Sequence, residues 1–270
     1  MDKFANERDY AVLQSDKYTF FVLGRLLKGN NTLLLTDHER LIICFSCDPF
    51  PVWIWNADDA TEEEFEKAYN LCKENGLMDG NHRFNIKYEL AEYFMKRALE
   101  DGITFVIETN MFAYDNPAPI APKDACEGSL HCCTEEDADA LVEFMDLFHH
   151  DIDTDYETME EYRKKAEVGI ANKGLYFWKD ASGRAVASCS WRPNGDMAAI
   201  GLVYTRVEAR RKHFAENLVY NVTMIVKEAG FTPMLYTDAD YVASNACYEK
   251  IGYILRGKLC TIAPVKGEAK

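Results

Sequence analysis

A proline-rich segment near the middle of the chain sets the strongest limit on its fold. Residues 114–127, with the sequence YDNPAPIAPKDACE, contain Pro117, Pro119 and Pro122. Each proline fixes the backbone φ angle and lacks an N–H donor, so neither a helix nor a central strand can run through this segment. The segment predicts a linker between two domains, residues 1–113 and residues 128–270. A chain of 270 residues is long enough for each domain to bury its own core.

The composition is that of a soluble globular protein. Hydrophobic residues make up 48% of the chain, but no uncharged apolar run is long enough to cross a bilayer, so we expect no membrane span. The first ten residues, MDKFANERDY, are charged and lack the apolar core of a signal peptide. We therefore expect a cytoplasmic protein whose nine cysteines are free thiols.

Acidic residues outnumber basic ones by 45 to 30, which gives a formal net charge of −15. A nucleic-acid-binding surface needs a basic face, so nucleic acid is not an expected partner. Residues 135–161 hold twelve acidic residues and no lysine or arginine. This run is either the solvated face of two helices or a negative wall that attracts a cationic amine.

The residues after the linker alternate between strand and helix patterns. Phe214, Leu218, Val222, Ile225 and Ala229 recur at helical spacing, and Gly230 is placed to end that helix. The expected order is a strand at 129–133, helices at about 135–148 and 157–171, three strands between 175 and 205 with a turn at 181–184, the helix just named, a strand at 233–237, a short helix at 244–250, and a strand pair at 252–262. This order, β-α-α-β-β-β-α-β-α-β-β, predicts an α/β fold with a mixed sheet and helices on both faces.

The residues before the linker give a similar but shorter pattern. Strands are expected at 32–36, 41–47 and 51–55, a helix at 85–102 and a strand at 103–114. Thr61 and Glu64 form a capping-box pattern that opens a further helix, and Gly76 suits its C-terminal end. Three strands, two helices and a strand repeat the order of the second half, which makes a diverged internal duplication a reasonable hypothesis.

Three consecutive basic residues, Arg210, Arg211 and Lys212, separate a predicted strand from the predicted helix that begins near Phe214. The start of a helix offers unpaired backbone N–H groups and a partial positive charge, which together bind phosphate groups. Basic side chains beside it add charge for a nucleotide-like diphosphate. The alternative interpretation is a solvated basic turn.

Two motifs in this half resemble the GNAT superfamily of N-acetyltransferases. The first is VYTRVEARRKHFAENLV, and the second, some 30 residues later, is SNACYEKIGY. In the acetyl-CoA loop of the family, Q/R-x-x-G-x-G/A, Arg210 and Ala215 match the first and last positions. Asn245, Tyr248 and the IGY at 251–253 match the second motif. The resemblance covers roughly residues 128–263 and implies a GNAT fold for the C-terminal domain.

The resemblance implies that acetyl-CoA is the co-substrate and that a primary amine attacks the thioester directly. A backbone amide near Leu202 or Val203 would meet the carbonyl, and the strand through Thr205 would pair with pantetheine. Asn245 would bond the pantetheine arm or the acyl thioester region. Tyr248 would protonate the leaving thiolate, because a phenol with a pKa of about 10 keeps its proton at neutral pH. The residues that would hold the pyrophosphate are Arg210, Arg211, Lys212, His213, Phe214 and Ala215.

Each of these assignments has a structural alternative. Tyr248 also fits a core tyrosine on an apolar helix face, and Asn245 fits a helix N-terminal cap. Glu208, in the strand-to-helix turn, is the candidate general base through water, but it also fits a surface carboxylate, and acids of the 135–161 run are further proton acceptors. His213 stands where the family usually has glycine, so its β-carbon can crowd the loop.

Other features carry less functional meaning. Cys44 and Cys47 form a lone C-x-x-C whose side chains would point to opposite faces of a strand, and we expect no metal. Arg206 stands where the family commonly has proline. Trp178 and Trp191 fit the core or a wall of the acceptor pocket.

The first half contributes differently if it repeats the fold. Its corresponding loop, NADDATEEE, carries Asp58, Asp59 and Glu62–Glu64, which would repel a pyrophosphate. Only the second half is therefore expected to bind CoA, while the first half shapes the acceptor site, regulates, or mediates self-association. The expected function is an acetyl-CoA-dependent N-acetyltransferase acting on a small-molecule or peptide amine. Two alternatives are a CoA-binding sensor without turnover and an N-acyltransferase for a longer acyl chain.

Overall fold

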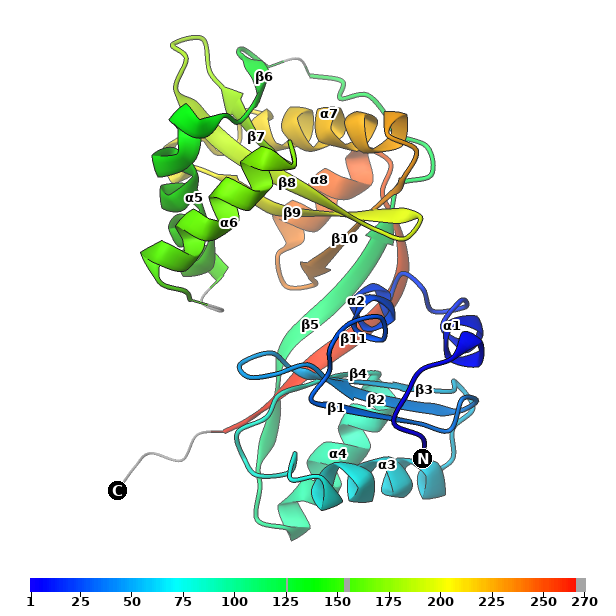
Figure 1. The fold of residues 1–270 in the computed structure, drawn as a ribbon. Coiled ribbons are helices and arrows are strands. Elements are labelled where there is room, and N and C mark those ends of the chain that lie inside the picture. Colours follow the sequence, from blue (N-terminus) through cyan, green and yellow to red (C-terminus); the bar gives the residue numbers. More distant parts are fainter. Residues whose placement is uncertain (125, 153–155, 266–270) are drawn as a thin grey trace, which may run out of the picture. The chain divides into compact units, whose positions relative to one another are not determined.

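The computed structural model describes residues 1–124, 126–152 and 156–265 (Figure 1). The chain divides into two compact units. The first contains residues 1–113, 238–240 and the described residues from 256 onward, and the second contains the described residues of 114–237 and 241–255. The two-domain boundaries expected from the sequence stay a prediction. The observed units differ from them because the C-terminal end of the chain joins the first unit.

The first unit is built on a mixed sheet whose strand order is β1-β2-β3-β4-β11-β5. Strands β1 to β3 are antiparallel, β3 and β4 are parallel, and β4 pairs antiparallel with β11. Its strands are β1 (Leu33–Thr36), β2 (Leu41–Phe45), β3 (Val52–Asn56), β4 (Phe84–Ile86), β5 (Phe105–Asp115) and β11 (Ile254–Pro264), and its helices are α1 (Glu7–Val12), α2 (Phe21–Leu26), α3 (Glu62–Glu74) and α4 (Tyr88–Glu100).

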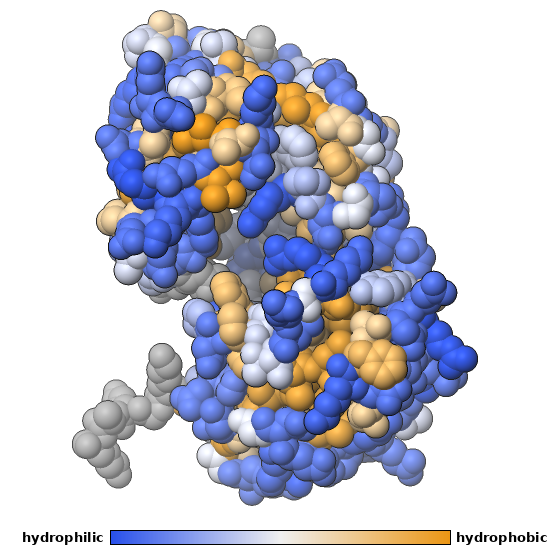
Figure 2. All heavy atoms as spheres, viewed as in Figure 1, coloured by the Kyte–Doolittle hydropathy of each residue, from blue (hydrophilic) through white to orange (hydrophobic). Residues whose placement is uncertain are grey.

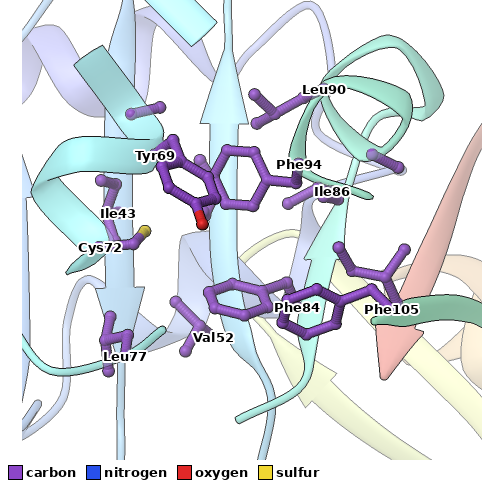
Figure 3. Packing of buried hydrophobic residues seen from close by; sticks show 14 of the residues in the cluster. Ile43, Val52, Tyr69, Cys72, Leu77, Phe84, Ile86, Leu90, Phe94 and Phe105 are labelled. Atoms are coloured by element: carbon purple, nitrogen blue, oxygen red, sulfur yellow. The ribbon is translucent and has the colours of Figure 1, made fainter. Parts of the chain in front are cut away.

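Helices α3 and α4 bury their apolar faces against this sheet. Figure 3 shows Tyr69 of α3 and Phe94 of α4 side by side over the strands, with Phe84 and Phe105 below them. The Tyr69 and Phe94 rings meet edge to face with centroids 5.3 Å apart, and Phe84 and Phe94 do so at 5.7 Å. Such pairs add to the stabilisation that comes from burying the rings. The buried Cys260 and Ile262 of β11 belong to the same cluster, so the end of the chain completes this core.

The second unit has a mixed sheet with the strand order β6-β7-β8-β9-β10, followed by the end of β5. Strands β6 to β9 are antiparallel, and β9 and β10 are parallel. Its elements are β6 (Ser129–Cys132), the 3₁₀ turn η1 (Glu135–Asp137), α5 (Ala138–Ile152), α6 (Met159–Ala171), β7 (Leu175–Lys179), β8 (Ala185–Asn194), β9 (Met197–Thr205), the 3₁₀ turn η2 (Val207–Ala209), α7 (Phe214–Glu228), β10 (Thr232–Asp238) and α8 (Val242–Lys250).

Two helix layers cover this second sheet. In Figure 1, α5 and α6 lie together in front of β7 to β9, and α7 lies behind these strands. The front layer buries Leu141, Phe144 and Tyr162 against Phe177 and Tyr204 of the sheet. The rear layer buries a different set of side chains, at the helical spacing predicted for α7, namely Phe214, Leu218, Val222 and Val226. The α/β fold class with a mixed sheet is confirmed.

The two units share one order of elements. Strands β1, β2 and β3, then α3, β4, α4 and β5, correspond to β7, β8 and β9, then α7, β10, α8 and β11. In both series the third and fourth strands are parallel. The last strand of each series lies beside the fourth strand of the other, because β11 pairs with β4 and β5 neighbours β10. This shared order supports the internal duplication.

Several local expectations were wrong. The strand pair expected at 252–262 is the single strand β11, which continues because its second half is a central strand buried beside β4. The helix expected from residue 85 begins at Tyr88, because Phe84–Ile86 form the buried strand β4. The short helices α1 and α2 were not expected. The capping box of Thr61 and Glu64 is present at the start of α3, as predicted.

The visible face of each unit in Figure 2 carries mainly hydrophilic side chains, in keeping with the 28% of charged residues in the chain. Among the described residues, no helix has the length and apolar character needed to cross a membrane.

Truncation of a buried β11 side chain will test whether the end of the chain completes the first core. Ile262 is fully buried opposite Phe84, so Ile262→Ala should lower the free energy of unfolding by about 2–5 kcal/mol. Ile254, on the same strand, is 47% exposed, and Ile254→Ala should change that free energy by less than about 0.5 kcal/mol. Urea unfolding of both variants measures the difference, and equal losses would contradict the assignment.

Candidate functional site: the diverging strands and the start of α7

Strands β9 and β10 pair over only part of their length. The parallel register joins Met197–Ile200 to Thr232–Leu235, yet β9 continues to Thr205 and β10 to Asp238. Beyond Ile200, β9 is aligned with β8 but not with β10. A parallel neighbour normally takes up the backbone donors and acceptors along one edge of a strand. The second half of β9 therefore offers an edge that an extended ligand can pair with.

A β-bulge interrupts β9 where this unmatched half begins. The register between β8 and β9 shifts by one residue between Ser188 and Ser190, so Cys189 faces both Leu202 and Val203. Leu202 has a φ of +48°, which is uncommon for a residue with a branched side chain. The buried Ser188 hydroxyl donates to the Leu202 carbonyl at 2.8 Å and holds the bulge in place. Bulges commonly re-aim the backbone beside functional sites.

The loop after β9 leads into α7 through two residues in the left-handed region. Arg211 has a φ of +64° and His213, the residue before the helix, has a φ of +62°. No side chain caps this helix start. Within the described residues, the backbone N–H groups from His213 to Glu216 donate no hydrogen bond to the protein. This row of donors, together with the positive end of the helix dipole, is suited to an anion.

The corresponding helix start in the first unit is closed. The Thr61 hydroxyl accepts a hydrogen bond from the Glu64 N–H, and the Glu64 carboxylate accepts one from the Thr61 N–H at 2.8 Å. Glu62, Glu63 and Glu64 occupy the first turn of α3. The contrast agrees with the expectation that only the second half can hold a pyrophosphate.

The three basic residues of the loop differ in how they are engaged. Arg210 donates to the Thr205 carbonyl at 3.1 Å and to the Asp151 carboxylate at 2.8 Å, and its guanidinium lies 5.6 Å from the centre of the Tyr204 ring. The hydrogen bond to Asp151 raises the pKa of Arg210. Arg211 and Lys212 are exposed and have no ion pair within the part of the chain that the structure describes. They are therefore the cations available to a ligand at this helix start.

Arg206 fixes the beginning of the loop. Its guanidinium makes two hydrogen bonds to the Glu143 carboxylate, at 2.7 and 2.9 Å, and lies 4.5 Å from the centre of the Phe144 ring. Its Nε donates to the Ala185 carbonyl at 3.1 Å. The proline that the family commonly has at this place would stiffen the loop by its ring, whereas Arg206 ties the loop to α5 and β8 through its side chain.

Glu208 is a weak candidate for the general base. Its carboxylate accepts a hydrogen bond from Arg184 at 2.6 Å on the surface of the protein. Its own backbone N–H and the Arg184 guanidinium lower the pKa of Glu208. A carboxylate with a lowered pKa accepts a proton less readily, so its surroundings favour a surface ion pair over a catalytic base.

Helix α8 brings Asn245 and Tyr248 to one buried face. The two residues are three positions apart, and they are 9% and 7% exposed. Burial raises the pKa of the Tyr248 phenol, which keeps its proton at neutral pH. The Tyr248 and Tyr253 rings have centroids 6.0 Å apart, so Tyr248 is also part of the packing beneath the helix.

His213 is surrounded by carboxylates rather than by cations. Its Nδ1 lies 3.3 Å from the Glu216 carboxylate, and its Nε2 lies 3.9 Å from that of Asp124. Its backbone carbonyl accepts hydrogen bonds from the backbone and side chain of Asn217, which fix the first turn of α7. The glycine of the family pattern would adopt this positive φ without the steric cost that a β-carbon brings.

The acidic run of 135–161 is largely neutralised by the chain's own cations. Although burial alone would raise the pKa of Asp137, hydrogen bonds from the Thr134 N–H, His131 and Lys179 lower it to about 2. The ion pairs are Asp137–Lys179, Asp139–Arg163, Glu143–Arg206, Asp151–Arg210, Glu157–Lys165 and Glu160–Lys164. Asp153 and Asp155 lie outside the described residues. These pairs agree better with a helix surface than with a wall for a cationic amine.

The remaining candidates have structural surroundings. Trp178 is buried, and its indole N–H donates to the Glu127 carbonyl at 2.8 Å. Trp191 packs against Phe231 with ring centroids 6.0 Å apart. Cys44 is buried, whereas Cys47 is exposed. The described residues contain no group of three or more His, Cys, Asp or Glu that could hold a metal ion.

Comparisons with known proteins identify the fold that carries this geometry. Residues 177–262, which span β8, the bulged strand β9, the loop, α7, β10 and α8, match the family model described as FR47-like protein. A GNAT-family acetyltransferase from Colwellia psychrerythraea superposes with a TM-score of 0.61 at 13% identity, over 98% of this chain and 99% of that one. This superposition confirms the resemblance to GNAT proteins at the level of the fold. The chain has the GNAT fold.

Two further structures show the same fold along nearly the whole chain. A GCN5-related N-acetyltransferase from Sphaerobacter thermophilus gives a TM-score of 0.66 at 12% identity, over 98% of this chain and 96% of that one. A Drosophila protein gives a TM-score of 0.65 at 13% identity, over 98% of both chains. No curated protein matches this chain by sequence. Because the GNAT likeness covers nearly the whole length, it extends to the first unit as well as to the second.

Sequence reasoning missed three contributors to this candidate site. The bulge at Leu202 gives no sequence signal, because it depends on the register with β8. The bond from Ser188 and the clamp of Arg206 on Glu143 join residues far apart in the chain. Asp151 did carry a signal, since an acidic residue in the last turn of a helix is unfavourable unless a cation faces it.

Substitution of His213 will measure the strain at the start of α7. His213→Gly removes the β-carbon from a left-handed residue and should raise the free energy of unfolding by up to about 1 kcal/mol. Ala215→Gly, two residues later inside the helix, should instead lower it by about 0.5–1 kcal/mol. Thermal and urea unfolding report both changes. A loss of stability in His213→Gly would mean that the imidazole contacts outweigh the backbone strain.

Proposed function

We propose that the protein is an acyl-CoA-dependent N-acyltransferase and that acetyl-CoA is its donor. The observation that carries this proposal is the row of unused N–H donors from His213 to Glu216, beside the unmatched half of β9. A pyrophosphate needs several converging donors and positive charge, and an extended pantetheine arm needs a strand edge. Both requirements are met by consecutive segments of the chain, with Arg211 and Lys212 adding charge.

In this proposal the chain's residues divide the work of acyl transfer. The backbone from Leu202 to Thr205 pairs with the pantetheine arm, and an N–H at the bulge donates to the thioester carbonyl oxygen as negative charge develops there. Phe214 and Ala215 contribute helix N–H groups to the pyrophosphate. Asn245 bonds the pantetheine end of the coenzyme.

Proton transfers complete the reaction. The amine nitrogen forms a bond to the acyl carbon, the carbon–sulfur bond breaks, and Tyr248 donates its phenolic proton to the departing thiolate. Tyr248 then regains a proton from water before the next turnover. The amine loses its proton to water that leads to solvent. Glu208 is a poor acceptor for that proton because Arg184 stabilises its charged form. Either a small-molecule or a peptide amine fits this chemistry.

A second candidate is a CoA-binding protein without turnover. The pairing of Glu208 with Arg184, together with the pairing of Glu143 with Arg206, favours it, because both carboxylates are held in the ionised, weakly basic form. Binding and turnover therefore have to be measured separately.

Binding of acetyl-CoA is the first test. Titration calorimetry should give saturable binding to the wild type, and the double variant Arg211→Glu, Lys212→Glu should bind at least about tenfold more weakly, which corresponds to roughly 1.4 kcal/mol. The control is Arg163→Glu, Lys164→Glu on α6, which makes the same charge change at an exposed site away from the loop. Equal losses in both double variants, or no binding to the wild type, would refute the proposed site.

Turnover is the second test. Thiol release from acetyl-CoA is followed with a panel of amines, and Tyr248→Phe should lower kcat by about a hundredfold or more while acetyl-CoA affinity stays within about twofold. Tyr253→Phe is the control, because the Tyr253 hydroxyl is bonded to Thr223 at 2.7 Å and has no role in the proposal. Binding without thiol release with any amine would favour the second candidate.

A further inference from the structure

Asp151, near the end of α5, contacts both loops that follow the diverging strands. Its carboxylate accepts a hydrogen bond from Arg210, in the loop after β9, at 2.8 Å. Its backbone carbonyl accepts one from the hydroxyl of Tyr241, directly before α8 and after β10, at 3.3 Å. A single residue of α5 therefore spans the place where β9 and β10 have separated.

The position of Asp151 is not explained by its own helix. A helix carries a partial negative charge at its last turn, and Asp151 lies in the last turn of α5. An aspartate at this position is therefore unfavourable by itself. Within the described residues, Arg210 is the cation with which the Asp151 carboxylate forms an ion pair. The contact with the coenzyme loop is thus what stabilises an acidic residue at this end of α5.

Helix α5 is attached to the loop by two contacts of different character. In the Arg206–Glu143 contact the guanidinium is enclosed, since the Arg206 side chain is 15% exposed, makes two hydrogen bonds and lies on the Phe144 ring, although the Glu143 side chain is 53% exposed. The Arg210–Asp151 contact is open, with side chains 41% and 39% exposed and one hydrogen bond between them. An exposed ion pair of this kind exchanges partners readily, whereas the enclosed one does not.

We propose that Asp151 is an internal competitor for an anionic group of the coenzyme at Arg210. This inference rests on the proposed function, because it assigns a residue that opposes binding at the same site. When the coenzyme binds, Arg210 exchanges the Asp151 carboxylate for a phosphate oxygen, and it keeps its second bond to the Thr205 carbonyl. The end of α5 is then released from the loop, while the Arg206–Glu143 contact retains the helix.

The exchange couples two parts of the site. Coenzyme affinity is reduced by the share of molecules in which Asp151 holds Arg210. By linkage, anything that draws the end of α5 away from the loop strengthens coenzyme binding, and the coenzyme in turn loosens the end of α5.

Removal of the Asp151 charge tests the competition directly. Asp151→Asn keeps the backbone carbonyl that Tyr241 contacts, and it should lower the dissociation constant for CoA about three- to tenfold in titration calorimetry at low ionic strength. The control is Asp146→Asn, which removes the same charge from α5 at a residue that faces His150 and not the loop. It should change the dissociation constant by less than about twofold. In an Arg210→Met background, Asp151→Asn should give no gain.

The measured affinities distinguish competition at Arg210 from a general charge effect. A gain that is specific to Asp151 and that disappears with Arg210→Met supports the competition. Equal gains from Asp151→Asn and Asp146→Asn, or a gain that persists in Arg210→Met, would overturn it in favour of a general charge effect. Unchanged affinity in Asp151→Asn with a wild type that binds CoA would overturn this inference alone. Failure of both proteins to bind CoA would remove the proposed function, and this inference with it.

Discussion

The partial pairing of two parallel strands is the constraint on which the rest of the second unit depends. Within the described part of the chain, β9 is in register with β10 over Met197–Ile200, and beyond Ile200 no described strand pairs with that edge of β9. Backbone donors and acceptors left without a partner are costly unless water or a ligand takes them up. The bulge at Leu202, the left-handed loop residues and the uncapped start of α7 all follow this point in the chain. The Ser188 hydroxyl takes up the Leu202 carbonyl, whereas the first N–H groups of α7 have no partner among the described residues.

The first unit shows what the same arrangement becomes when the chain pairs its own groups. Strands β3 and β4 are in register over only two residues. There the Lys87 ammonium, 12% exposed, donates to Asp58 at 2.5 Å, to Asp16 at 2.8 Å and to the Asn56 carbonyl at 2.9 Å. The capping box of α3 also occupies helix-start N–H groups of the kind that α7 leaves open. The two units thus share an order of elements but differ at the corresponding helix start. The start of α3 is acidic and capped, whereas the start of α7 follows basic residues and is uncapped.

Local patterns in the sequence predicted the helices whose start or buried face is determined by residues close together in the chain. The capping box of Thr61 and Glu64 located the start of α3, and helical spacing from Phe214 located α7, because both signals act within a few residues. Strand β4 was missed, since three residues owe their conformation to neighbours on both sides rather than to their own propensity. The motif of Arg210 to Ala215 was found, but the pairing of Arg210 with Asp151 was not. The acidic residue at the end of α5 indicated that a cation faces it, but no local pattern identifies a partner 59 residues away in the sequence.

The strongly acidic character of the chain explains why pairing matters so much at this site. At a net charge of −15, the protein as a whole repels a polyanion such as CoA, so attraction has to come from charges within a few ångströms. Arg206 and Arg210 are paired with Glu143 and Asp151 in this structure, so the initial attraction comes from the helix N–H groups, Arg211 and Lys212. Salt then acts in two opposing ways, because it screens the long-range repulsion as well as the short-range attraction. A shallow salt dependence of affinity therefore follows from this charge arrangement, in contrast to the steep loss expected for a site on a basic protein.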